Sequence, residues 1–213
     1  MILKYLICAL AGYLVGTVNP AYILARLKGF DIRKRGSGNA GASNALILFG
    51  KLTGILCALF DIAKAAVIVL VMSKIYRELS FAYVVTSVAC ILGHIFPFYM
   101  KFRGGKGLAC LGGVILAFDW RVFLIMLACE TVIVLLTKYI CFVPMSASFI
   151  FAAIYGIFRR DLIGVALLLV IAAVIVWKHR ENIRRIRKGT EARISTLWNK
   201  DKELERVQKN MQK

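Results

Sequence analysis

The sequence predicts an all-α, polytopic integral membrane protein with about seven transmembrane helices. Three observations predict this class: 60% of the 213 residues are hydrophobic, the mean hydropathy is +0.75, and long apolar runs alternate with short basic connections. A soluble domain does not need so apolar a composition to fill its core. A helix that crosses the hydrocarbon layer needs roughly 20 apolar residues, or somewhat fewer when it is buried among neighbours.

The apolar runs define the predicted helices in order along the chain. The first run is too long for a signal-peptide core and lacks a clear cleavage site, so we expect a retained helix. The segment 27–51 begins rich in glycine and becomes apolar at 45–49, which favours a location in the interface or partway into the membrane. The run 107–118 is short and leaves the helix count open by one or two. Spans are expected near 2–26, 52–73, 81–99, 107–118, 121–138, 141–158 and 162–177.

The basic residues set the expected orientation. The chain has 29 Lys and Arg against 11 Asp and Glu, a formal net charge of +18. In so apolar a chain this excess indicates cytoplasmic loops and contact with membrane lipids rather than nucleic acid. The connections around 28–35, 101–106 and 138 are richer in uncompensated positive charge than those around 74–78, 119–121 and 159–161. We therefore expect the N-terminus outside and the C-terminus in the cytosol.

Two parts of the chain are expected: a single membrane domain, 1–178, and a basic cytosolic tail, 179–213. Residues 178–213 hold 12 Lys or Arg and 5 Asp or Glu, a net charge of +7. The simplest interpretation is a solvated topology anchor near the membrane surface, which we expect to be helical from Thr196 onward. The six cysteines form no Cys-x-x-Cys pair, so the sequence predicts no metal site, disulfide or cofactor.

The first of three polar stretches reads Gly-Ser-Gly-Asn-Ala-Gly-Ala-Ser-Asn at 36–44. Small residues let the backbone approach a ligand, and turns of this kind form anion-binding concavities from backbone N–H groups. Small residues also let membrane helices approach closely, but two Asn and two Ser within eight positions exceed what packing requires. The candidate binding residues are Gly36, Ser37, Gly38, Asn39, Gly41, Ser43 and Asn44.

The second stretch, Arg-Gly-Gly-Lys-Gly at 103–107, precedes an apolar helix. The free N–H groups and the positive end of the helix dipole would face the same point as Lys106, which suits a phosphate. It is not a Walker A loop, because no Ser or Thr follows Lys106 directly. The alternative is a positive loop that only fixes topology. The candidates are Arg103, Gly104, Gly105, Lys106 and Gly107.

The third stretch supplies His179, Glu181 and Asn182 directly after the last span. Positions 179 and 182 share a helical face if the helix continues. A lone interfacial histidine is more often structural than catalytic, and His179 gains weight because the simplest threading puts all three stretches on one side of the bilayer.

Charged and polar side chains are also expected inside the membrane. Asp61 and Lys64 are spaced to pair on one turn of a helix, which would reduce the cost of burying their charges. His94 precedes Pro97 and is either a packing histidine satisfied by the backbone or a ligand-binding residue.

The three stretches together resemble the bacterial acyl-phosphate:glycerol-3-phosphate acyltransferase family, PlsY. The matching motifs are Gly-Ser-Gly-Asn-x-Gly-Ala-Ser-Asn at 36–44, Gly-His-x-Phe-Pro with Gly-Gly-Lys-Gly between 93 and 107, and His-Arg-Glu-Asn-Ile at 179–183. Their order and separations match from the first span to about residue 194.

The resemblance implies transfer of a fatty acyl group from acyl phosphate to the sn-1 hydroxyl of glycerol 3-phosphate, the first step of phospholipid synthesis. It implies a bacterial plasma-membrane enzyme of seven helices with its active site on the cytosolic side. Lys106, Ser37, Asn39 and His179 would be catalytic, and the other candidates of the three stretches would bind substrate. No His-x4-Asp dyad is present, so a phosphate oxygen of the substrate is expected to accept the hydroxyl proton.

Two positions depart from the family pattern. Ile47 stands where the family usually has an arginine, and 141–146 replaces a serine-rich stretch. Ser146 or Ser148 is expected to compensate, although Pro144 changes the local backbone. The alternative hypothesis is therefore a weakened or inactive paralogue that binds anionic lipids or phosphorylated metabolites. A transporter is disfavoured, because the polar stretches lie near one face and no paired broken helices lie at the midplane.

Overall fold

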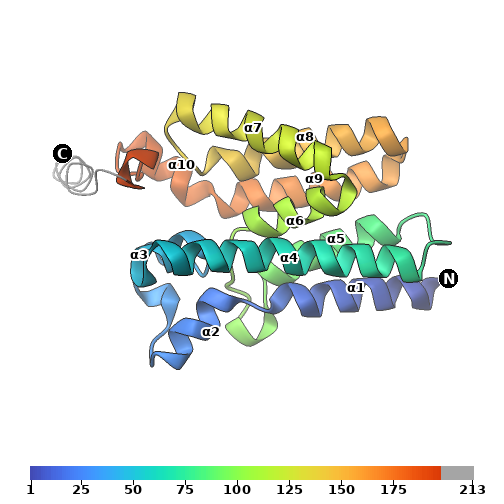
Figure 1. Ribbon diagram of the computed structural model, residues 1–213, viewed down its shortest axis with the longest axis horizontal. Helices are drawn as coiled ribbons and strands as arrows, with labels where there is room; N and C mark the ends of the chain where they lie inside the picture. Colours follow the sequence, from blue (N-terminus) through green and yellow to red (C-terminus); the bar gives the residue numbers. More distant parts are fainter. Residues whose placement is uncertain (198–213) are drawn as a thin grey trace.

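The computed structural model describes residues 1–197, which form ten α-helices, three short 3-10 helices and no strand. The helices run side by side along the long axis of a bundle (Figure 1). This confirms the all-α class. The helix expected from Thr196 onward falls almost wholly outside the described residues.

The first predicted span is broken into two helices. α1 (Ile2–Thr17) and α2 (Pro20–Leu27) meet at an angle of 43°. Pro20 has no N–H to continue the hydrogen bonding of α1, and the Asn19 side chain accepts from the N–H of Tyr22 to start α2 instead. A sequence reading based on apolar length alone joins these helices, because the residues on both sides of the break are apolar.

α3 (Ala42–Phe49) and α4 (Lys51–Ile75) follow the glycine-rich segment and the 3-10 helix η1 (Ile32–Lys34). The apolar stretch expected at 45–49 forms the second half of α3. α3 lies against the start of α4, where a side chain at Gly54 would collide with Leu46. The glycine therefore allows the short helix to lie directly on the long one.

α5 (Ala82–Ile95) is the most enclosed helix and packs tightly on α1. Gly12 and Gly16 of α1 and Gly93 of α5 bring the two backbones into contact, since a Cβ at any of them would strike a main-chain oxygen of the other helix. This is the small-residue packing typical of membrane helices. A 3-10 turn, η2 (Phe98–Met100), then leads to the 103–107 loop.

The remaining helices complete the bundle. They are α6 (Leu108–Phe118), α7 (Trp120–Thr137), α8 (Phe142–Arg159), α9 (Leu162–Lys178) and α10 (Arg180–Arg187), followed by η3 (Ile194–Leu197). Large apolar side chains such as Leu59, Leu135 and Val170 are exposed on the outer faces, as lipid contact requires.

Four of the described helices, or six if each bent pair counts once, are long and apolar enough to cross a membrane. The second bent pair joins α9 and α10 at 45°. α6 has only 11 residues, about 16 Å of helix. The predicted count of about seven therefore includes one helix, α6, that does not reach across on its own.

Pro144 does not disturb its helix, contrary to expectation. α8 begins at Phe142, so Pro144 lies in the first turn, where backbone N–H groups lack an intrahelical partner in any case.

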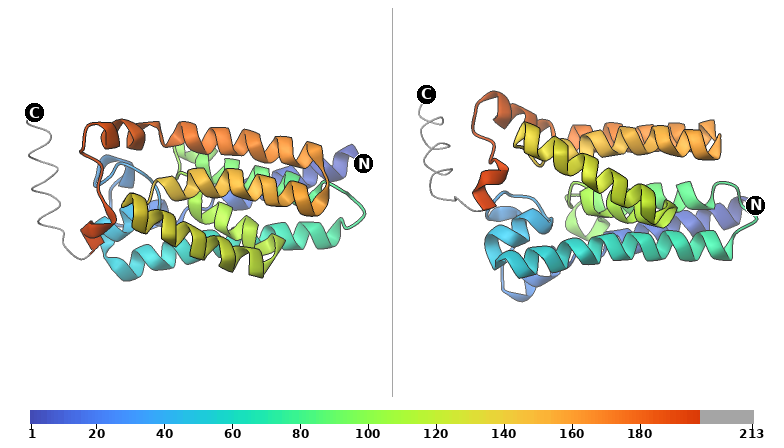
Figure 2. Two further views of the ribbon diagram at one scale, coloured as in Figure 1. Left: turned by 90° about the horizontal axis from the view of Figure 1, so that it is seen from above. Right: turned by 45° about the horizontal axis from the view of Figure 1, so that its top comes forward.

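α3 and α10 lie at one end of the bundle and Met1 at the other (Figures 1 and 2). The loop 103–107 leads into α6 from the end that α3 and α10 occupy, because Lys106 touches α10. The structure thus gathers the three polar stretches at one end, as the threading predicts.

Candidate active site

Asn44 organises the first polar stretch. Its side-chain oxygen accepts from the N–H of Ser37 at 2.8 Å, and its amide donates to the carbonyl oxygens of Ile32 and Arg35, both at 3.0 Å. The side chain is fully buried. Asn44 is predicted to bind substrate, but in the structure its side chain forms hydrogen bonds with the backbone of the loop.

The loop that Asn44 holds presents small polar groups. Ser37 and Ser43 are exposed, and Asn39 is half-buried. Gly36 and Gly38 have φ angles of +60° and +73°, a conformation that favours glycine. Ser43 lies in the first turn of α3, which begins after Gly41. The free N–H groups of that turn are suited to an anion.

The glycines of the second stretch anchor their loop on the end of α5. The N–H of Gly104 donates to Ile95 O at 3.0 Å, and that of Gly105 donates to His94 O at 3.1 Å. Gly107, with φ of +91°, starts α6. Between these fixed points Lys106 projects from the loop, half-buried, while Arg103 is exposed.

The third stretch meets the second at Lys106. The Lys106 ammonium donates to the side-chain oxygen of Asn182, and the Asn182 amide donates to Glu191 at 2.5 Å. Arg185 donates to the other oxygen of Glu191, also at 2.5 Å.

His179 is buried, with Nδ1 at 2.8 Å from the carbonyl oxygen of Ile175. Because a carbonyl can only accept, Nδ1 carries the proton and a neutral ring keeps Nε2 as an acceptor.

Glu191, and not Glu181, contacts Asn182. Glu181 is exposed and lies 3.5 Å from Arg184 on the surface of α10, and its expected contact with substrate stays a prediction. Glu191 reaches Asn182 because Gly189, with φ of +68°, turns the chain back after α10. The sequence could have indicated Glu191, because it is the single acidic residue in the basic stretch between Ile183 and Ile194.

Arg33 connects the first stretch with the second. It pairs with Asp31 at 2.6 Å and donates to the carbonyl oxygens of Met100 and Arg103. The hydrogen bond from Arg33 lowers the pKa of Asp31 to about 2. Residues 31–44 are therefore tied to the approach to the glycine loop.

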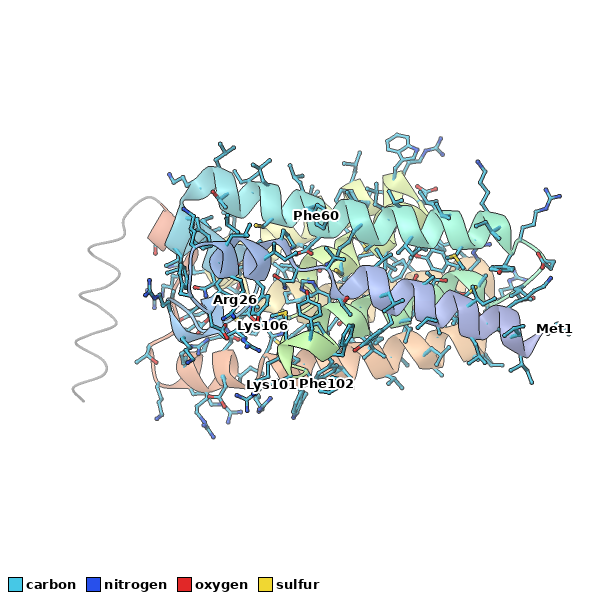
Figure 3. The ribbon with its side chains drawn as sticks, turned by 90° about the horizontal axis from the view of Figure 1, so that it is seen from below. Met1, Arg26, Phe60, Lys101, Phe102 and Lys106 are labelled. Atoms are coloured by element: carbon cyan, nitrogen blue, oxygen red, sulfur yellow. The ribbon has the colours of Figure 1, made fainter. Side chains whose placement is uncertain are left out.

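Lys106 is the most perturbed cation of the site. Burial lowers the pKa of Lys106 to about 8, and the positive charge of Arg185 acts in the same direction. Figure 3 shows Lys106 among the side chains toward the end of the bundle away from Met1. An anion bound there would gain the ammonium as a partner and restore its charge.

The two departures from the motif pattern are visible in the structure. Ile47 is 52% exposed on α3 and offers no polar atom. Ser146 donates to Glu130 at 2.7 Å, and Ser148 donates to Met145 O at 2.9 Å. The expectation that either serine compensates at the anion site is wrong, because both hydroxyls face their own helices and α7.

Comparisons with known proteins identify the family of this chain. A family model described as glycerol-3-phosphate acyltransferase matches residues 6–189. The chain belongs to the glycerol-3-phosphate acyltransferase family. Glycerol-3-phosphate acyltransferase 1 of Deinococcus radiodurans is 38% identical over 198 residues, 91% of this chain and 98% of that protein. The Coxiella burnetii glycerol-3-phosphate acyltransferase is 37% identical over 194 residues, 90% of this chain and 99% of that protein.

Solved structures of this acyltransferase family share the fold. The glycerol 3-phosphate form of PlsY, an integral membrane glycerol 3-phosphate acyltransferase, superimposes with a TM-score of 0.82 at 32% identity. The alignment covers 91% of this chain and 96% of the other. A lysophosphatidic acid form gives a TM-score of 0.80. The protein described here is therefore an integral membrane acyltransferase.

Proposed function

We propose that this acyltransferase takes its acyl group from acyl phosphate and transfers it to the sn-1 hydroxyl of glycerol 3-phosphate, giving lysophosphatidic acid and inorganic phosphate. The observation that carries the proposal is the meeting of two anion-suited segments at Lys106, which belongs to the glycine loop and donates to Asn182. Two phosphate groups must be held for this reaction, one leaving with the donor and one anchoring the acceptor.

Lys106 and the glycine loop suit the phosphate of the donor. Gly104, Gly105 and Gly107 let the loop lie directly against the end of α5, and the start of α6 offers free N–H groups to an anion. As the bond between the carbonyl carbon and the phosphate oxygen breaks, the leaving phosphate takes the electron pair. The Lys106 ammonium and Arg103 would stabilise that growing negative charge.

The remaining polar groups suit the acceptor. Ser37, Asn39 and Ser43 of the first stretch, with His179 and Asn182 of the third, would hold glycerol 3-phosphate and polarise the acyl carbonyl. Gly36, Gly38 and Gly41 would allow close approach, while Asn44 and Glu191 would act by holding these segments in place.

The hydroxyl proton has two possible acceptors. In the scheme we favour, the sn-1 oxygen attacks the carbonyl carbon and its proton passes to an oxygen of the donor phosphate. No cofactor or metal enters this scheme. The contact of His179 Nδ1 with Ile175 O leaves Nε2 oriented as an acceptor, so His179 is the competing base. A pH-rate profile that follows the His179 pKa and is abolished by His179→Gln would contradict the substrate-assisted scheme.

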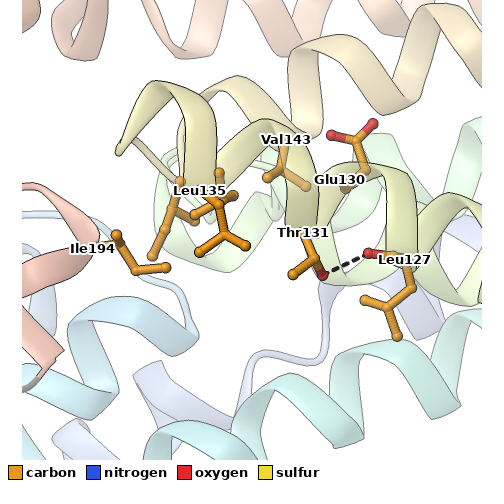
Figure 4. A pocket seen from close by; sticks show the side chains of 8 residues that line it. Leu127, Glu130, Thr131, Leu135, Val143 and Ile194 are labelled. Carbon is orange, nitrogen blue, oxygen red and sulfur yellow. Dashed lines mark hydrogen bonds between the residues drawn. The ribbon is translucent and has the colours of Figure 1, made fainter.

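A pocket of about 220 Å³ beside this end of the bundle, apolar apart from Glu130 and Thr131, suits the acyl chain. Leu127, Thr131, Leu135 and Val143 line it along α7 and α8, and Ile194 lines it from the C-terminal segment (Figure 4). The N–H of Ile194 donates to Lys138 O at 2.9 Å, which brings that segment onto the end of α7. Membrane lipids would contact the bundle on the side of α7 and α8, so the acyl donor would enter the pocket sideways from the bilayer.

We place the protein in the plasma membrane of a bacterial cell. The site would face the cytosol, and the N-terminus would lie outside. The excess of Lys and Arg in the connections at the end of the bundle holding the site supports this orientation. The basic tail from residue 179 would complete the site with its first helix, α10, and meet the membrane surface beyond it.

The deciding experiment uses purified protein with acyl phosphate and glycerol 3-phosphate, following release of phosphate and formation of lysophosphatidic acid. Acyl-CoA is the parallel donor. We expect turnover with acyl phosphate and its loss in Lys106→Ala. Turnover with acyl-CoA alone would overturn the proposed donor. Binding of glycerol 3-phosphate without turnover, abolished by Lys106→Ala, would favour the inactive paralogue instead.

A further inference from the structure

Three ionisable groups lie buried together between α4 and α5. Asp61 is 2% exposed, Lys64 8% and His94 3%. The Lys64 ammonium lies 2.6 Å from Asp61 Oδ1 and 3.3 Å from His94 Nδ1, and the His94 and Asp61 atoms are 3.5 Å apart. Ionisable groups inside a membrane domain are costly to bury and usually serve function. The reaction proposed above uses none of them directly.

The cluster provides its own cation. Ligand-type atoms of Asp61, His94 and Cys110 lie within 4.8 Å of one another, a spacing that a metal ion could use. The Lys64 ammonium is already bonded to two of these three groups. Lys64 therefore supplies the positive charge beside Asp61 and His94. The role of the cluster follows from the backbone groups that these side chains also contact.

One arm of the cluster reaches the glycine loop. A Cβ at Gly105 would fall on Nε2 of His94, so the imidazole ring lies directly against the Gly105 backbone. The carbonyl oxygen of His94 also accepts from the N–H of Gly105 at 3.1 Å. Lys106 is the next residue, so the position of the ring sets the place of the backbone from which the ammonium reaches Asn182.

A second arm reaches the first polar stretch. Lys64 donates to Gly16 O at 3.0 Å and to Val18 O at 2.5 Å, at the break between α1 and α2. The next residue, Asn19, is buried and donates to the carbonyl oxygen of Ala40 at 2.7 Å. Ala40 lies between Asn39 and Gly41.

We propose that Asp61, Lys64 and His94 are positioning residues that fix the 36–44 segment relative to the 103–107 loop, and so align the acceptor with the donor. The inference rests on the proposed function of those segments. Neither arm touches substrate. The cluster acts through two short paths, from Lys64 through the α1–α2 break to Ala40, and from His94 through Gly105 to Lys106.

The first test removes both charges at once with the double variant Asp61→Asn and Lys64→Met, which leaves no unpaired buried charge. We expect KM for both substrates to rise at least tenfold, with a fall of only a few degrees in Tm in detergent, because the carbonyl oxygens of Gly16 and Val18 lose a donor. Thr86→Val is the control, because Thr86 is a buried polar residue of α5 whose hydroxyl donates to Ala82 O within its own helix and which belongs to neither path. A merely structural role would lower kcat in proportion to folded protein and leave both KM values unchanged, which would overturn the proposal.

The second test separates the two arms at His94. His94→Asn keeps a polar atom near the place of Nδ1, facing Lys64, but removes the ring edge that touches Gly105. His94→Gln places its amide near the position of Nε2. We expect His94→Asn to raise KM for the acyl donor about tenfold with little change for glycerol 3-phosphate, and His94→Gln to restore part of the loss. Equal changes in both KM values, or none, would contradict the two-arm arrangement.

The proposed donor and the positioning role can fail separately. If the parent protein uses acyl-CoA and not acyl phosphate, the donor proposal fails, and the double variant is then assayed with acyl-CoA. A tenfold rise in KM for glycerol 3-phosphate would still support the Lys64 arm, and an unchanged KM would overturn it.

Discussion

Lys106 combines burial with a required positive charge, which makes its pH dependence informative. Its pKa of about 8 lies below the ordinary lysine value because the charged form is desolvated. The ammonium is therefore lost as pH rises through about 8, and we expect KM for the acyl donor to rise about tenfold for each pH unit above it. A phosphate with a single substituent, such as an acyl phosphate, is already a dianion in this range, so the ligand does not titrate.

Lys106→Arg provides the matched control, because a guanidinium keeps its charge throughout this pH range. The variant should bind more weakly in absolute terms but show a flat profile between pH 7 and 9.5. A steep profile in Lys106→Arg would assign the pH dependence to another group.

Gly105 has no room for a side chain. A methyl group there would meet the His94 ring, and the loop is held on both sides, so we expect Gly105→Ala to lower kcat/KM at least tenfold. Gly112→Ala is the control, since a Cβ at Gly112 would make only ordinary contacts, 3.6 Å from Phe123 and 3.8 Å from Ile62. Steady-state kinetics compare the two, and a Gly105→Ala enzyme as active as Gly112→Ala would contradict the proposed loop geometry.

Ile47 marks a place where the acyltransferase can be improved. It lies one helical turn beyond Ser43 on α3 and is 52% exposed, so an arginine at this position could reach an anion near the start of the helix. A charge-assisted contact contributes about 1.5–3 kcal/mol, which corresponds to roughly ten- to a hundredfold in affinity. Ile47→Arg should lower KM for glycerol 3-phosphate by at least tenfold, while Ile47→Gln should not. Identical KM values for the two variants would refute the contact.

At the level of elements, the contact of Asp31 with Arg33 fastens the first polar stretch to the chain around Met100. The Arg33 hydrogen bond lowers the pKa of Asp31 to about 2 in the folded protein. A depressed carboxyl pKa stabilises the fold above the unfolded value of about 3.9, and this stabilisation disappears as pH falls toward 2.

Asp31→Asn should therefore lower Tm at pH 7 by about 2–4 °C, the shift that roughly 1 kcal/mol produces in a chain of this size. The difference from the parent should shrink below pH 4. Glu78→Gln, which removes a surface ion pair with Lys4, should change Tm little at any pH. A Tm difference for Asp31→Asn that persists at pH 2 would exclude the ion pair as its cause.

Local spacing predicts some elements well and others poorly. The Asp61–Lys64 pair was expected from their three-residue separation and is present at 2.6 Å. The break at Asn19 and Pro20 was missed, because hydropathy does not register a lost N–H group. The contact of Glu191 with Asn182 depends on the turn at Gly189 and on a hydrogen bond that no helical period encodes. The roles of the other candidate residues stay predictions until they are tested.

For the whole molecule, the threading predicts that the end holding Lys106 faces the cytosol. Two exposed positions at opposite ends test it: Lys28, in the connection after α2, and Ser80, between α4 and α5. In intact cells a membrane-impermeant maleimide should label Ser80→Cys but label Lys28→Cys only after permeabilisation. The parent protein is the control, because its exposed Cys129 lies on the lipid-facing helix α7. The reverse labelling pattern would show that the end holding Lys106 faces the outside of the cell.

The break between α1 and α2 also links two residues that lie 44 positions apart. The carbonyl oxygen of Gly16 would normally accept from the N–H of residue 20, but residue 20 is a proline. Val18 likewise loses its partner, because the N–H of Tyr22 turns to Asn19. Lys64 occupies both vacancies. Lys64 thus supplies the donor that the chain lacks at the Pro20 break. We expect relatives without the proline to lack the lysine, and relatives without the lysine to lack the proline.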